Sequence, residues 1–269
     1  MKKKVLITVK TYPTLSNKYD ETVCTAGIDE DGNWIRIYPV PYRKLYTQYN
    51  KYQWIELDLI KRTKDPRPES LNPTNVDNIK LLNTLGTENS WQERKKFIFK
   101  TKIYTNKKEI IDLAHDNKLS LVTFKPSKIT GFNIKPTDRE WPQEKVELIK
   151  SKAKQESLFE EAREFVLMPK IPYIFSYIFE DDEGVESKLM IEDWEAPQLY
   201  LNMMKKENDE EKACQAVKDK YMGFVKNKDI YLFLGTTYEN HLKKNRNPFV
   251  ITGVFYPPIK TQGDLFSQF

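Results

Sequence analysis

Cysteine, histidine and glycine are all scarce in this 269-residue chain. The two cysteines, Cys24 and Cys214, lie far apart, which excludes a disulfide framework and a cysteine-based metal cluster. Such cysteine usage is typical of a reducing compartment, so we expect a cytoplasmic protein. The sequence also contains no phosphate-binding loop of the G-x-x-x-x-G-K type, which argues against a nucleotide-hydrolysing enzyme of that class.

Long apolar runs are missing as well. No stretch approaches the roughly 20 apolar residues of a membrane span, and we expect no membrane contact. The first residues, MKKKVLITV, have too short an apolar run for a secretory signal and predict a β-strand instead. Aromatic residues are plentiful at 13%, and they provide the area for a core although hydrophobic residues make up only 39% of the chain.

The net charge of +5 is mild and does not by itself indicate a nucleic-acid partner. Its distribution is more informative. Residues 94–108 contain seven lysines and arginines and no acid, with Phe97, Phe99 and Tyr104 between them. Interleaved cations and aromatic rings are typical of surfaces that bind nucleic-acid strands.

The first third of the chain reads as β-structure. Alternating apolar residues predict strands over 4–12, 22–28, 33–40 and 52–63, and the DEDG sequence at 29–32 predicts a hairpin turn. Residues 65–75 are rich in proline and asparagine and predict an irregular loop.

The remainder mixes helices with strands. We expect a helix over 90–97 capped by Ser90, and a helix over 106–117 capped by Asn106. Further predicted strands cover 119–134, 171–181, 187–194, 229–238 and 247–258, and further predicted helices cover 142–168, 195–206 and 208–225. The fold class predicted from this order is α+β.

Several of these stretches resemble the dual OB-fold proteins. The segments that carry the resemblance are VCTAGIDEDGNWIRI (23–37), RPESLNP (67–73), SLVTFKPSKI (120–129), FSYIFEDDEGVESKLMIEDWE (175–195) and DIYLFLGTTYE (229–239). Two positions depart from the family pattern, because Ser70 replaces an asparagine and Phe233 replaces a serine.

The resemblance implies two small OB-like antiparallel β-barrels with helical insertions and a charged connecting helix. The corresponding domains are a first barrel over 1–141, a connecting helix over 142–168, a second β unit over 169–259 and a C-terminal tail over 260–269. The resemblance also implies a DNA- or RNA-binding protein of bacterial genome defence or DNA processing, with no established chemistry and no cofactor.

Alternation along the third predicted strand places Trp34, Arg36 and Tyr38 on one face. Such a face suits nucleic acid, because phosphates need cations and bases need flat apolar rings. We expect the surface to continue through further basic residues, namely Arg43, Lys44, Arg94, Lys95, Lys96, Lys100 and Lys102. In a competing interpretation Trp34 and Tyr38 fill the barrel core and Arg36 reaches outwards, and the basic side chains are simply solvated.

Two other functions stay open. Asp182, Glu186 and Lys188 weakly resemble the Asp…Glu-x-Lys pattern of nucleases that use Mg²⁺, although an acidic hairpin turn is the simpler explanation. The two histidines suggest no catalytic pair, because His115 ends a predicted helix and His241 lies in a basic loop where we expect it to be solvated or to touch phosphate. The third possibility is an interaction subunit without nucleic-acid contact.

The chain ends on a polar segment that carries Gln262-Gly263-Asp264-Leu265-Phe266. This pentapeptide resembles the motif by which bacterial proteins bind the replication sliding clamp. A Leu-Phe pair on a flexible peptide suits a preformed hydrophobic pocket, and Gln262 and Asp264 supply polar contacts beside it. We therefore expect Gln262, Asp264, Leu265 and Phe266 to bind the clamp; alternatively Leu265 and Phe266 pack back onto the chain's own core.

Overall fold

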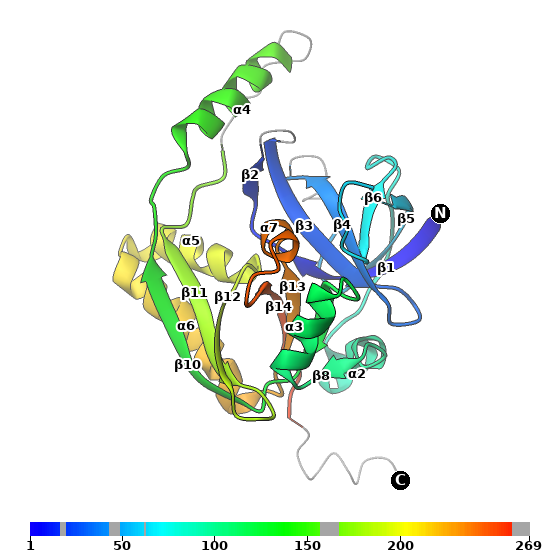
Figure 1. The fold of residues 1–269 in the computed structure, drawn as a ribbon. Coiled ribbons are helices and arrows are strands. Elements are labelled where there is room, and N and C mark those ends of the chain that lie inside the picture. The colour runs from blue at the N-terminus through cyan, green and yellow to red at the C-terminus, as the bar shows by residue number, and fades with distance from the viewer. Residues whose placement is uncertain (17–19, 43–48, 62, 157–166, 260–269) are drawn as a thin grey trace.

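The computed structural model describes residues 1–16, 20–42, 49–61, 63–156 and 167–259. Over these residues the protein is of the α+β class, with one sheet that closes into a barrel and two further sheets covered by helices (Figure 1). The fold class expected from the sequence is therefore confirmed. None of the helices in these ranges is long and apolar enough to cross a membrane.

Five strands close the N-terminal barrel. They are β1 (Lys2–Lys10), β3 (Asp20–Ile28), β4 (Trp34–Pro41), β6 (Ser70–Pro73) and β5 (Gln53–Lys61), in that spatial order. The ring closes because β1 pairs antiparallel with β5 as well as with β3. One pairing is parallel, between β4 and β6, where Arg36 faces Ser70. The short β2 (Thr14–Ser16) pairs with β3, and β7 (Lys80–Thr84) extends β5.

Strand β1 shows why its sequence is apolar on both faces. Val5 and Ile7 point into the barrel core, whereas Leu6 and Val9 pack outside it against a second cluster that includes Phe233 and Phe255. A strand buried on both sides reads as a continuous apolar run, as VLITV does. The barrel is thus joined to the rest of the molecule through one of its own strands.

The first hairpin forms as predicted. Asp29 at its start accepts hydrogen bonds from the backbone N–H groups of Asp31 (3.1 Å) and Asn33 (2.9 Å). Gly32 adopts a φ of 91°, a conformation that residues with a side chain rarely reach. The turn therefore depends on both the aspartate and the glycine of the DEDG sequence.

The C-terminal part contains the other two sheets. One holds β10 (Lys128–Pro136), β11 (Tyr173–Glu180) and β12 (Glu186–Met190), and the other holds β14 (Phe249–Phe255), β13 (Tyr231–Thr236), β9 (Leu121–Phe124) and β8 (Ile103–Tyr104). The chain runs from β9 almost directly into β10. At the other side a single parallel bridge joins Ile191 to Ile251, just beyond the end of β12.

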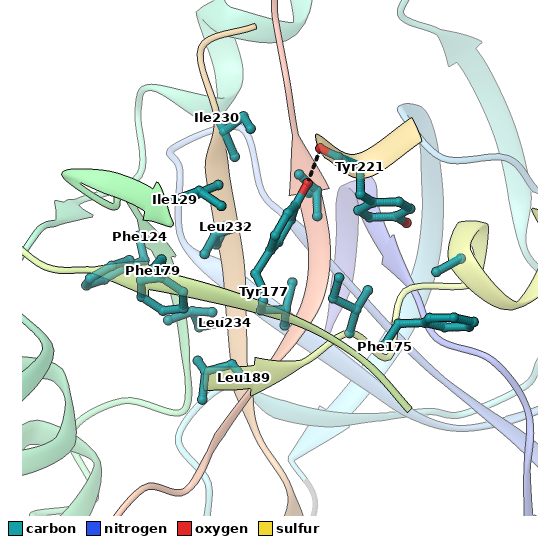
Figure 2. Close-up of a cluster of buried hydrophobic side chains, with 14 of the residues drawn as sticks. Phe124, Ile129, Phe175, Tyr177, Phe179, Leu189, Tyr221, Ile230, Leu232 and Leu234 are labelled. Atoms are coloured by element: carbon teal, nitrogen blue, oxygen red, sulfur yellow. Dashed lines mark hydrogen bonds between the residues drawn. The ribbon is translucent and has the colours of Figure 1, made fainter. Parts of the chain in front are cut away.

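Helices α5 (Glu195–Glu207) and α6 (Glu210–Asn227) cover these sheets (Figure 1). Their shared core is rich in aromatic rings, and within it the hydroxyl of Tyr177 donates a 2.8 Å hydrogen bond to the carbonyl of Tyr221 on α6 (Figure 2). Phe179 packs against Phe124 between the sheets, with ring centres 5.7 Å apart. Aromatic residues thus supply the buried area that the modest hydrophobic content does not.

The other helices are α2 (Glu88–Ile98), α3 (Lys107–His115), α4 (Gln143–Glu156) and α7 (Tyr238–Leu242). Helix α3 begins as predicted, because the side chain of Asn106 accepts a 3.0 Å hydrogen bond from the N–H of Glu109. Helix α4 lies at the periphery, beyond β10 and β11 (Figure 1).

Three local predictions were wrong. Residues 65–75 are not wholly irregular, because Ser70–Pro73 form β6 and complete the barrel. Ser90 does not cap α2, since the helix begins at Glu88 and Ser90 has a φ of 56° inside it. The strand expected over 119–134 is two strands, β9 and β10, which pair with the C-terminal β13 and β11.

Candidate ligand-binding cavity

A cavity of about 490 Å³ lies between the N-terminal barrel and the C-terminal sheets. This volume falls within the roughly 300–1,000 Å³ typical of small-molecule sites. The barrel contributes residues from the segment after β1, from the adjacent strands β3 and β4, and from the loop after β5. The C-terminal part contributes residues 190–192 beside β12, residues of β13 and β14, and the segments around Trp141 and Lys170.

Arg36 is the most deeply buried cation of the cavity wall. It is 2% exposed, and one guanidinium nitrogen donates to the carbonyl (3.0 Å) and the hydroxyl (3.2 Å) of Ser120. A second nitrogen lies 3.5 Å from the sulfur of Cys24. Its Nε has no hydrogen-bond partner in the part of the chain that the structure describes. Burial and the neighbouring charge of Arg67 lower the pKa of the Arg36 guanidinium, which nevertheless stays protonated in a protein.

Arg67, from the loop after β5, is held more completely. Its guanidinium makes a two-pronged ion pair with Asp65, at 2.9 and 2.7 Å, and its remaining nitrogen donates to the carbonyl of Thr236 at 2.7 Å. The guanidinium also lies 5.6 Å from the ring centre of Tyr238. Arg67 therefore fixes the loop after β5 against the end of β13, and its charge is largely balanced by Asp65.

Glu192, in the segment that follows β12, also lines the cavity. Its carboxylate makes no hydrogen bond or ion pair to another residue in the described ranges. Burial raises the pKa of Glu192, and the positive charge of Arg36 opposes that rise. A half-buried carboxylate without a donor is unusual, since buried polar groups generally have partners.

Aromatic side chains supply much of the remaining wall, namely Tyr12, Tyr38, Trp141 and Tyr238. Several are anchored by their polar ends. The hydroxyl of Tyr12 donates to the carbonyl of Pro169 at 2.6 Å. The indole N–H of Trp141 donates to the carbonyl of Met168 at 2.8 Å. Lys170 lies beside Trp141, 5.8 Å from the ring centre.

The two walls are tied together next to the cavity. The N–H of Tyr12 donates to the carbonyl of Glu192 at 3.1 Å. Nearby, the ammonium of Lys51 contacts both Asp193 and Glu195 at 3.0 Å, and Asp193 is only 1% exposed. Burial raises the pKa of Asp193. For Lys51 burial acts to lower the pKa, but the two carboxylates more than offset it and the pKa is raised.

The structure divides the aromatic and basic residues singled out from the sequence. Arg36 and Tyr38 line the cavity. Trp34 instead packs against Phe233, with ring centres 5.2 Å apart, and its indole N–H has no partner among the described residues. The competing interpretation expected Trp34 to be packed, as it is, but Arg36 is buried and does not reach outwards. Arg43 and Lys44 lie outside the described residues.

The basic residues of α2 and the segment after it lie away from the cavity. Arg94 donates to the carbonyl of Leu85 at 2.9 Å and lies 3.9 Å from the ring centre of Tyr52, so it is packed rather than free. Lys95 is half-buried, whereas Lys96 and Lys100 are exposed beside Phe97. Lys102 is exposed and pairs with Glu109 at 3.0 Å.

The acidic residues of the nuclease hypothesis lie on a hairpin. Asp182 is exposed and accepts hydrogen bonds from Thr105 (2.7 Å) and Asn106 (3.1 Å), which tie the hairpin to the start of α3. Glu186 and Lys188 are exposed on β12. In the part of the chain that the structure describes, no group of three or more His, Cys, Asp or Glu side chains is arranged to hold a metal ion.

His241 is not solvated, contrary to the prediction from its basic loop. It is 6% exposed, with Nδ1 3.2 Å from the hydroxyl of Thr236 and Nε2 2.9 Å from Oδ1 of Asn117. His115 does end a helix as expected, and its Nε2 lies 3.0 Å from the carbonyl of Asn245.

Sequence reasoning missed Arg67, Glu192, Tyr12, Trp141 and Lys170. Arg67 lies within RPESLNP (67–73) and Glu192 lies within residues 175–195, two of the segments that resemble the dual OB-fold proteins. The charge of Arg67 within a proline-containing motif was a signal that sequence reasoning could have used. Nothing in the sequence, however, indicates that the segments of these five residues meet in the fold.

The fold and cavity define an α+β protein with a closed five-stranded barrel and a second β unit. The cavity lies between these two parts. The chain belongs to the family described as "Domain of unknown function (DUF8757)", whose model matches residues 104–269. Residues 1–100 match a second family, described as "Domain of unknown function (DUF8758)". No curated protein matches the chain.

Two solved structures show a distant likeness. The crystal structure of the tetrameric p202 HIN2 covers 97% of this chain and 92% of its own, at 10% identity and a TM-score of 0.32. The structure of a murine DNA binding protein bound with ds DNA covers 97% and 96%, at 9% identity and a TM-score of 0.30. Similarity at this level carries no argument about what the present chain binds.

Proposed function

We propose that the protein binds single-stranded nucleic acid in the cavity between its two parts. The observation that carries the proposal is the position of the cavity on the barrel. Five-stranded OB barrels bind oligonucleotides on the face of their second and third strands, between the loops after the first and fourth strands. Counted around this barrel those strands are β3 and β4, and the loops are those that contain Tyr12 and Arg67.

The C-terminal sheets support a two-barrel interpretation. Taking β9 and β10 as one bent first strand gives the order β10-β11-β12-β14-β13-β9, which is the order of the N-terminal barrel. The pairing between the third and fifth strands is parallel in both, through Arg36 and Ser70 in one and Ile191 and Ile251 in the other. We infer a second OB-like barrel whose corresponding seam faces the same cavity.

The chemistry of the walls fits a strand of nucleic acid. Bases stack on aromatic rings at roughly 1–3 kcal/mol each, independently of sequence. Lys170 and the buried Arg36 supply positive charge for phosphate or base oxygens. The cavity is too small for a duplex, so a single strand is the occupant that we propose.

Fluorescence anisotropy with a labelled single-stranded oligonucleotide tests this function. Trp141→Ala should weaken binding about 10-fold through the loss of one stacking ring. Lys170→Ala should weaken it less and make the dependence on salt shallower. Lys128→Ala, on the exposed edge of β10 and outside the cavity, is the matched control. Equal affinity for all four proteins, or no salt-dependent binding by the unaltered protein, would refute the proposal.

We propose further that the C-terminal pentapeptide tethers the protein to a bacterial sliding clamp, which agrees with a role in DNA processing or genome defence. The support is the sequence Gln262-Gly263-Asp264-Leu265-Phe266, which lies outside the described residues. Co-elution with purified clamp should occur with the full chain and disappear in the Leu265→Ala/Phe266→Ala variant. Persistence of the complex in that variant would rule out this motif.

A further inference from the structure

Two residues that line the cavity, Arg36 and Glu192, carry polar groups without a hydrogen-bond partner among the described residues. Arg36 comes from β4 of the barrel, and its Nε is buried without a partner in these ranges. Glu192 follows β12 of the C-terminal part, and its carboxylate has no donor among the described residues. Leaving either group buried and unpaired costs free energy, typically about 1–3 kcal/mol for a polar group and more for a charged one.

Among the described residues no carboxylate makes an ion pair with Arg36. Its hydrogen bonds go to Ser120 and Cys24, and the carboxylate of Asp65 already pairs with Arg67. Glu69, which acts on Arg36 at longer range, has its carboxylate occupied by Ser120 at 2.8 and 2.5 Å. A buried guanidinium in this situation favours a ligand that brings hydrogen-bond acceptors.

Glu192, in contrast, favours a ligand that brings hydrogen-bond donors. An ionised carboxylate is purely an acceptor, and two adjacent N–H groups on a ligand satisfy both of its oxygens. A ligand that contacts both residues must therefore offer acceptors to Arg36 and N–H donors to Glu192. Its flat apolar faces would meet the aromatic wall residues.

We propose that the cavity binds a single unstacked guanine base through Arg36 and Glu192, an inference that rests on the nucleic-acid binding proposed above. Guanine carries O6 and N7 acceptors, which suit an arginine, on one edge. Its N1–H and N2–H₂ donors lie on the adjoining edge and suit a carboxylate. Adenine would place its N6 amine against the guanidinium, and cytosine and thymine each offer the carboxylate fewer donors.

The test compares oligothymidylates that carry one internal guanine, adenine, cytosine or thymine. Anisotropy with the full chain should show about 10-fold tighter binding of the guanine oligomer, which corresponds to one well-made base contact. Glu192→Gln should abolish this preference, because an amide has one acceptor oxygen and turns its NH₂ donor towards the N–H donors of guanine. The Glu192 side chain makes no hydrogen bond to another described residue that the variant would lose, and a thermal melt verifies that the variant is folded.

Two controls keep the result specific. Glu211→Gln makes the same chemical change at an exposed position on α6 and should leave the guanine preference intact. Glu192→Ala should also lose the guanine preference. Titration with guanosine monophosphate separates a free nucleotide from a base within a strand, since weaker binding of the mononucleotide is expected when the backbone also contributes.

The possible failures are distinguishable. Salt-dependent binding of all four oligomers with equal affinity overturns the guanine site and leaves the proposed function standing. The same holds if Glu192→Gln keeps the guanine preference. Binding of guanosine monophosphate without binding of any strand overturns the proposed function and keeps the guanine site. Binding of neither overturns both.

Discussion

The two β units share a strand order but close in different ways. In the N-terminal barrel β4 and β6 pair at two successive positions, and β1 and β5 pair at five. In the C-terminal unit β12 and β14 are joined only by the bridge between Ile191 and Ile251, among the described residues. The weaker seam lies at the cavity, where Met190, Glu192 and Thr252 are wall residues. The difference shows that the C-terminal unit has fewer backbone pairings where its residues line the cavity.

The ionic contacts of the two units differ in the same way. The C-terminal seam is tied to the barrel by Lys51 with Asp193 and Glu195, which are charged, largely buried groups. The barrel's own ring is tied by backbone hydrogen bonds and an apolar core, and the ion pair between Lys2 and Glu56 across β1 and β5 is more exposed. Substitutions in the two regions should therefore differ in the size of their effects, and four predictions follow from this contrast.

The largest loss of stability should come from adding a side chain where two barrel strands approach closely. A Cβ at Gly27 would lie 2.1 Å from the carbonyl oxygen of Leu6 on the adjacent β1, which is backbone and cannot swing aside. Gly27→Ala should lower the free energy of unfolding by more than about 4 kcal/mol or prevent folding. Gly131→Ala on β10 is the control, because its nearest neighbour is the side chain of Ile178 at 3.5 Å. Urea denaturation of both variants decides, and similar stabilities would show that the β1–β3 contact is not so tight.

The second largest loss of stability should come from removing the cation of the buried ion pairs between Lys51 and the carboxylates of Asp193 and Glu195. Lys51→Met leaves Asp193 and Glu195 without their cation, and we expect a loss of about 3 kcal/mol in the free energy of unfolding. Adding Asp193→Asn to Lys51→Met should restore part of the loss, because one unpaired carboxylate is removed. A double-mutant cycle by urea denaturation measures this coupling, and strictly additive effects would contradict the contact.

A smaller effect is expected within the C-terminal core. Tyr177→Phe removes the hydroxyl that donates to the carbonyl of Tyr221 and keeps the ring in place (Figure 2). The expected loss in stability is about 1–2 kcal/mol, because the carbonyl is left buried without this donor. Tyr238→Phe, whose hydroxyl donates from an exposed position, should cost less. A reversed order in thermal melts would argue against the arrangement of the core.

The smallest effect concerns pH. Burial, reinforced by Arg67 and Arg36, lowers the pKa of His241 below its ordinary value of 6.5. The unfolded chain therefore binds a proton more readily than the folded protein, and stability should fall as the pH drops from about 6.5 towards the lowered pKa. His241→Asn should flatten this part of the stability profile. Parallel profiles for both proteins, measured by urea denaturation at a series of pH values, would show that His241 does not titrate in this way.

Much of the fold was predictable because local patterns governed it. Asn106 caps α3, DEDG forms its turn, and alternating residues mark β4 and β11. The strand β6 escaped prediction because its four residues, SLNP, have turn-like composition and are held as a strand only by β4 and β5. The break between β9 and β10 likewise depends on their different partners, β13 and β11.

Only the part of the cavity lining that comes from β4 could be predicted from the sequence. Alternation correctly placed Arg36 and Tyr38 on the β4 face that now lines it. Trp34 belongs to the same set, yet its ring packs against Phe233, because the C-terminal sheet covers that end of the strand. Glu192, Trp141 and Lys170 come from segments far from β4 in sequence, and only the tertiary fold brings them to it.

Photo-crosslinking gives the most direct test of the central claim that the cavity, rather than the exposed basic residues, holds the nucleic acid. A single-stranded oligonucleotide with one photoreactive thioguanine would be irradiated with the full chain, and the modified peptides identified by mass spectrometry. The account predicts crosslinks at Tyr12, Tyr38, Trp141 or Tyr238. Crosslinks confined to residues 94–102, with none at the cavity, would contradict it.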